Sequence, residues 1–110
     1  MAIPTLVTGD DITLPVTLKK KGLTFVIDAG ATIVARLVSA DRESVYTPEI
    51  AQTTAAVGAD LANSLIILTF ASADTALVTH QGSALLEIQV DDGGKLTWFT
   101  SVRIVRGQIG

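Results

Sequence analysis

The feature that most limits the fold is the alternation of apolar and polar residues near the C-terminus. Residues 83–91 and 95–105 place an apolar side chain at nearly every second position, and Asp92-Gly93-Gly94 separates them. Because successive side chains of a β-strand point to opposite faces, this period indicates two strands that each bury one face. A short loop rich in glycine joins antiparallel neighbours, so the pattern predicts a β-hairpin.

The register of this hairpin follows from matching its apolar faces. The apolar face of the first strand contains Ala84, Leu86, Ile88 and Val90, and that of the second contains Leu96, Trp98, Thr100 and Val102. These faces meet if Asp91 pairs with Lys95, which leaves a three-residue loop with glycine available for a positive φ. The paired charges would contribute a few tenths of a kcal/mol, roughly. The same register predicts three pairs on the face away from the core: Glu87 with Phe99, Gln89 with Thr97, and Leu85 with Ser101.

The rest of the chain shows the same alternation in shorter segments. The pattern predicts strands over residues 12–18, 23–27, 31–39, 50–57 and 65–70. Pro15 cannot donate a hydrogen bond to a neighbouring strand, so the first of these segments is expected at a sheet edge. The polar run Lys19–Gly22 is typical of a hairpin loop. Residues 72–77 predict one helical turn, with Ser72 as a possible N-terminal cap.

Together these elements predict an all-β fold in one domain, residues 1–110. The expected architecture is an immunoglobulin-like antiparallel β-sandwich of about seven strands with one short helical turn. A compact jelly roll or a small barrel is the alternative.

Composition excludes several classes of function. The net charge is -3 and the only basic run is Lys19-Lys20-Lys21, so no nucleic-acid partner is expected. The longest apolar run, Leu65–Leu68, is far too short to cross a membrane, and the N-terminus does not resemble a signal peptide. Without cysteine there is no thiol nucleophile or zinc–thiolate site. Hydrophobic residues make up 48% of the chain and charged residues only 17%, which favours assembly with a partner.

The candidates for chemistry are two acidic pairs and one histidine. Asp10-Asp11 and Asp91-Asp92 could hold a cation only if their loops met at one end of the sandwich, because calcium needs six to eight oxygen ligands. Aspartates in turns more commonly bond to local backbone groups. His80 lies outside any nucleophile motif. The sequence therefore predicts a protein that is not an enzyme and needs no cofactor.

Adjacent aromatic residues indicate an interaction surface instead. Trp98 is expected in the core, so Phe99 must face outward in a regular strand. An outward phenylalanine beside Leu85 predicts a contact patch, unless another part of the domain covers that face. The predicted partner-binding residues are Phe99, Leu85, Glu87, Thr97 and Arg103, with the terminal segments 1–7 and 104–110 beside them.

Two stretches resemble a known kind of protein. These are GDDITLPVTLKKKGLTFVIDAGATIVARLV at residues 9–38 and LLEIQVDDGGKLTWFTSVRIVRG at residues 85–107. Their order of strands and turns resembles small immunoglobulin-like modules of tailed-phage virions, in particular the N-terminal domain of baseplate upper proteins and of tail-fibre attachment proteins. The likeness consists of strand and turn patterns, with no single diagnostic residue.

The resemblance implies a non-enzymatic structural component of a bacteriophage particle, assembled in the bacterial cytoplasm. It would dock on other virion proteins as a tail or baseplate adaptor, or as a fibre-attachment module, and would form a homo-oligomer in the particle. Such proteins usually continue into a long C-terminal part, so a capsid decoration (cement) protein on the phage head is an alternative. A carbohydrate-binding β-sandwich for host recognition is a further alternative, with Tyr46, Trp98 and the acidic pairs as its candidates.

Overall fold

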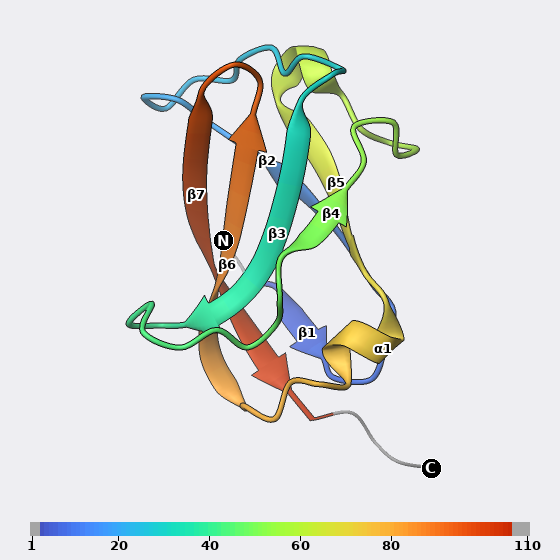
Figure 1. Cartoon of the computed structure of the whole chain (residues 1–110), viewed down its shortest axis with the longest axis vertical. Coiled ribbons are helices and arrows are strands. Elements are labelled where there is room, and N and C mark those ends of the chain that lie inside the picture. Colours follow the sequence, from blue (N-terminus) through green and yellow to red (C-terminus); the bar gives the residue numbers. More distant parts are fainter. Residues whose placement is uncertain (1–2, 107–110) are drawn as a thin grey trace.

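Two β-sheets and two single helical turns make up the protein (Figure 1). The computed structural model describes residues 3–106. The strands are β1 (Thr5–Val7), β2 (Ile12–Thr17), β3 (Thr32–Ser39), β4 (Ile50–Gln52), β5 (Leu65–Phe70), β6 (Gly82–Asp91) and β7 (Lys95–Val105). The helical turns are η1 (Leu61–Asn63) and α1 (Ser72–Thr75). Neither turn within residues 3–106 could span a bilayer. The all-β prediction is confirmed.

The order of the strands is that of an immunoglobulin-like sandwich. One sheet has the order β1-β7-β6-β3-β4, and the other contains β2 and β5. Figure 1 shows the two-stranded sheet behind the larger one. In immunoglobulin-like domains the third, sixth and seventh strands of the pattern likewise share a sheet, opposite the second and fifth. Buried side chains from both sheets form one core, which includes Ile66, Leu68, Leu86 and Ile88.

The β6–β7 hairpin has the predicted register. Asp91 pairs with Lys95 across the loop, and Glu87 pairs with Phe99 further along the ladder. The four apolar residues of β6 that were assigned to the core are all buried. β3 lies between β6 and β4, which agrees with the apolar character of both faces of residues 31–39. The match of apolar faces therefore fixed the pairing of the longest strands.

β1 was not predicted, and it pairs with β7 in parallel. This pair is the exception to an otherwise antiparallel ladder. Leu6 is only 3% exposed and anchors the short strand in the core. Three residues are too few to show an alternating pattern, so the sequence carries no recognisable signal for this strand.

The predicted strand over residues 23–27 is wrong. Lys21 and Gly22 form the expected tight turn with positive φ values of 52° and 79°, but only one bridge, between Lys20 and Leu23, follows it. Ile27 is 2% exposed, and its N–H donates to the Leu61 carbonyl instead of to a strand. Only Ile27 is fully buried here: Phe25 packs against the edge of the core, while Leu23 and Val26 are about 70% exposed, so the alternating pattern of these residues does not mark a strand. The strand predicted over 50–57 is also shorter, ending at Gln52.

Gln52 joins the two sheets along one side. Its Nε2 donates to the Thr69 carbonyl at 3.1 Å, and its Oε1 accepts from the Thr69 N–H at 2.7 Å. The side-chain amide thus bonds β5 as a peptide group of a neighbouring strand would. This bridge connects β4 to β5 where no backbone ladder exists.

Replacing Gln52 by alanine should therefore lower the free energy of unfolding by about 1–2 kcal/mol, because both backbone groups of Thr69 lose their partner. Chemical denaturation measures this change. Gln81→Ala is the matched control, since Gln81 is exposed and lies outside the strands. Equal stabilities of the two variants would show that the bridge contributes nothing.

Candidate functional site

The five residues predicted to bind a partner lie on one face of the five-stranded sheet. Leu85 and Glu87 alternate along β6, and Thr97, Phe99 and Arg103 alternate along β7. The register places them on the side away from the core, because the residues that alternate with them, such as Leu86, Ile88 and Val102, face the core. We call this side the outer face. The sequence therefore predicted which residues share the face, and the structure brings them together.

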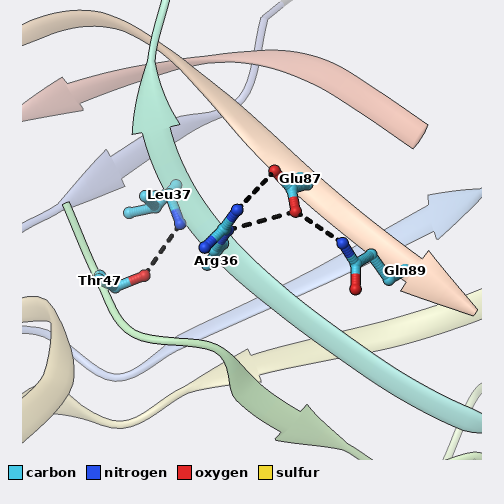
Figure 2. Close-up of polar contacts among 5 residues, drawn as sticks. All are labelled: Arg36, Leu37, Thr47, Glu87 and Gln89. Carbon is cyan, nitrogen blue, oxygen red and sulfur yellow. Dashed lines mark hydrogen bonds and ion pairs between the residues drawn. The ribbon is translucent and has the colours of Figure 1, made fainter. Parts of the chain in front are cut away.

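A charged network that the sequence analysis did not identify lies at the centre of the outer face (Figure 2). Arg36 of β3 contacts Glu87 through two bonds, Nε to Oε1 at 3.2 Å and Nη2 to Oε2 at 3.3 Å. Gln89 Nε2 donates to the same Oε1 at 2.9 Å. Glu87 is only 7% exposed, and a carboxylate so buried requires such partners. The one signal in the sequence was an arginine within residues 31–39, a predicted strand that is otherwise largely apolar.

Apolar side chains surround this network. Val38 is 2% exposed although it belongs to the outer face, and its cross-strand partner Leu85 is half-buried. The guanidinium of Arg42 lies 3.9 Å from the centre of the Phe99 ring. Phe99 thus points outward as predicted, while the loop after β3 covers part of its ring. The ring is therefore partly exposed on the outer face and partly covered by another part of the domain.

The loop that carries Arg42 is held by its own hydrogen bonds. Arg42 has a φ of 65°, a conformation that is uncommon for residues other than glycine. The Asp41 carboxylate accepts from the Ser39 hydroxyl and from the Glu43 N–H. These donors, the hydroxyl first, hold the pKa of Asp41 below its usual value of 3.8.

The position of Arg42 on Phe99 should therefore be lost in acid. A carboxyl group whose folded pKa is lowered stabilises the loop above pH 3.8, and this effect disappears as the pH falls through the lowered value. Nuclear magnetic resonance titration of the Glu43 amide and of the Phe99 ring protons should show one shared midpoint below 3.8. Asp41→Asn is the control, and it should abolish the transition. A midpoint at 3.8 or higher would contradict the assignment.

The two acidic pairs do not meet. Asp91 and Asp92 belong to the hairpin at the top of Figure 1, whereas the turn before β2 lies beside α1 near the bottom. The condition for a shared cation site, with Asp10 and Asp11 at the same end, is therefore not met. Within residues 3–106 no group of three or more histidines or acidic residues could hold a metal ion.

The aspartates before β2 instead fasten the α1 turn. Asp11 Oδ1 accepts from the Ser72 N–H at 2.7 Å, so this distant carboxylate caps the helix. Thr75 is buried, and its hydroxyl donates to the Asp10 carbonyl at 2.8 Å and accepts from the Gly9 N–H at 3.0 Å. The prediction that the Ser72 side chain is the cap is wrong, because the N-cap position is Ala71.

Mutation can distinguish the two adjacent aspartates, because Asp11 bonds through its side chain and Asp10 only through its backbone carbonyl. Asp11→Ala should lower the free energy of unfolding by about 1 kcal/mol, since the first turn of α1 loses its cap. Asp10→Ala should change it by less than about 0.5 kcal/mol, because only the backbone carbonyl of Asp10 is used. Urea denaturation of both variants provides the comparison. Similar losses in both would contradict a capping role.

Two further pairs of aromatic rings stack on each other. Trp98 stacks on Phe25 with a centroid separation of 5.7 Å, and its Nε1 donates to the Lys19 carbonyl at 3.0 Å. Tyr46 stacks on His80 at 4.6 Å. Trp98 packs against the core as predicted, although it is half-buried at the end of the sandwich. One face of each ring is therefore already occupied.

Comparison of the chain with protein-family models and with curated proteins finds no match. The terminal segments of the predicted surface are seen in part: residues 5–7 and 104–105 lie in β1 and β7, next to the outer face. Residues 1–2 and 107–110 lie outside the described residues.

Proposed function

We propose that this protein is a non-enzymatic structural component of a bacteriophage virion. It docks on other virion proteins through its outer face, as a tail or baseplate adaptor or as a fibre-attachment module. The resemblance of residues 9–38 and 85–107 to immunoglobulin-like virion modules suggests this setting. An all-β fold with the expected order of strands is compatible with it.

The observation that carries the proposal is the composition of the outer face. The exposed side of an antiparallel sheet is ordinarily polar. Here the half-buried Leu85 and Phe99 lie beside the carboxylate of Glu87, which is 7% exposed and paired with Arg36. Protein interfaces have this arrangement, with apolar and aromatic residues at the centre and few free charges. Because the ion pair is formed in advance, a partner would not have to desolvate an unpaired charge.

A capsid decoration protein would use the same surface on the phage head, so the geometry does not distinguish head from tail. In either place the symmetry of the particle would bring many copies together, which makes a homo-oligomer the expected state there. Carbohydrate binding is less favoured, because Tyr46 and Trp98 each stack on a neighbouring ring. No observation on the outer face favours a sugar.

The location of the protein tests the proposal. Virions purified from bacteria that carry the gene should contain the chain when analysed by mass spectrometry. Immunogold labelling should then place it on the tail or baseplate, whereas labelling of the head would support the decoration alternative. If purified virions lack the chain altogether, the proposal is wrong.

A pair of substitutions tests the surface. Leu85→Asp should reduce incorporation into particles, with a loss of about 2 kcal/mol in binding free energy, because it places a charge at the apolar centre of the interface. Thr13→Asp, on the exposed side of the two-stranded sheet, is the matched control and should incorporate normally. Circular dichroism checks folding, and Thr97→Arg offers a second change at an exposed position of the outer face. If Leu85→Asp and Thr97→Arg both incorporate as well as the control, the outer face is not the docking surface.

A further inference from the structure

A groove crosses the outer face near the pairing of β1 with β7. Side chains of β6 and β7, the N-terminal segment and the loop after β3 all contribute to its lining. Leu85 is half-buried and provides an apolar side chain in the groove, and Ser101 lies opposite it in the ladder. The lining residues include Ile3, Thr5, Ala40, Leu85, Ser101 and Arg103.

Two arginines near this groove lack an acidic partner. Arg103 lies opposite Ser83 on β6 and opposite Thr5 on β1, so its neighbours across both ladders are uncharged. The guanidinium of Arg42 lies on the Phe99 ring. Both arginines are exposed, and neither forms an ion pair within residues 3–106.

The spacing of the two guanidinium groups follows from the period of β7. Phe99, Ser101 and Arg103 are alternate residues of the strand and share the outer face. Because a strand rises about 3.3 Å per residue, Phe99 and Arg103 are separated by roughly 13 Å. Arg42 on the Phe99 ring and Arg103 therefore lie on either side of Leu85, which is opposite Ser101.

The acidic residues nearest to these arginines do not compensate them. Asp41 and Glu43 flank Arg42 in the sequence, but neither forms an ion pair with it. The Asp41 carboxylate accepts hydrogen bonds from its own loop instead, and Glu87 is bound by Arg36. The whole chain has a net charge of -3, so two uncompensated cations on one face oppose the charge of the protein as a whole. Such a face is complementary to an acidic partner.

A second copy of the protein does not fit this face. Two copies that met face to face about Leu85 would be related by a two-fold axis, which places the same surface on both sides of the contact. Whether that axis runs along the strands or across them, Arg42 of one copy would approach Arg42 or Arg103 of the other. Like charges in that position are unfavourable, so the carboxylates have to come from a different protein.

We propose that the partner presents an acidic segment to the outer face. An apolar side chain of that segment occupies the groove beside Leu85, and carboxylates on either side of it pair with the guanidinium groups of Arg42 and Arg103. The planar guanidinium suits this role, because it can bind a carboxylate through two hydrogen bonds. The inference rests on the proposed docking role of the outer face, and it adds the charge of the partner and the two residues that recognise it.

Three short peptides test this preference. The acidic probe is the acetylated and amidated heptapeptide Thr-Glu-Thr-Leu-Thr-Glu-Thr. In an extended chain its carboxylates lie on the same side as the leucine, and their residues are roughly 13 Å apart. The other two peptides carry glutamine or lysine in place of both glutamates. Each is added to the full chain at low salt, and nuclear magnetic resonance follows the Nε–H signals of Arg42 and Arg103 and the methyl groups of Leu85.

The acidic peptide should shift all of these signals. It should bind about tenfold more tightly than the glutamine peptide, because it forms two exposed ion pairs. The lysine peptide should not bind, and raising the salt concentration should remove the advantage of the acidic peptide, since exposed charges are screened. Equal binding of the acidic and glutamine peptides, or no shift with the acidic peptide at millimolar concentration, would overturn the proposal.

Substitutions assign the effect to the two arginines. Arg42→Gln and Arg103→Gln should each weaken binding of the acidic peptide about threefold and leave that of the glutamine peptide unchanged. If both peptides lose affinity equally, the arginines act on the structure of the groove, and the ion-pair assignment is wrong. Lys19→Gln is the matched control, because it removes the same charge beside Trp98 at the end of the sandwich and should not alter binding.

The peptide and virion experiments can fail separately. If the acidic peptide binds as expected while virions lack the chain, the virion assignment is wrong and the preference for an acidic partner stands. If virions incorporate the chain in a way that depends on Leu85 while the acidic and glutamine peptides bind equally, the docking role stands and the acidic partner is excluded.

Discussion

The structure depends most on the match between the apolar faces of β6 and β7. A slip of one residue would turn every side chain of a strand to the opposite face. The pairing of Asp91 with Lys95 therefore decides that Leu86 and Ile88 enter the core and that Glu87 and Phe99 do not. β3 takes its register from β6, and β1 takes its place from β7, so both sides of the large sheet follow from this one hairpin.

The outer face shows how that register creates a surface as well as a core. Arg36 and Glu87 face each other because β3 and β6 are paired there, and the Arg36 guanidinium compensates the largely buried carboxylate. Removing one partner would leave the other charge buried and unpaired.

Much of the fold could be predicted, because six of the seven strands have an apolar pattern that local sequence reveals. The five residues predicted for the interaction surface share one face for the same reason. The prediction failed where an apolar loop residue enters the core without a strand, as with Ile27, and where a strand is too short to show a period, as with β1. It also missed Arg42 on Phe99, since that contact joins a loop to a strand far away in the chain.

By itself, the sequence determined the period-two pattern, the hairpin register and the alternation of Trp98 inward with Phe99 outward, because these depend on neighbours along the chain. The tertiary structure alone decided what distant segments do to one another. It brought the Asp11 carboxylate to the Ser72 N–H, where it caps the helical turn, and it placed the two acidic pairs at opposite ends of the sandwich. It also placed β1 beside β7, where Arg103 N–H donates to the Pro4 carbonyl. Hydrogen bonds between segments depend on their positions in space, and a periodic pattern specifies only which face each residue occupies.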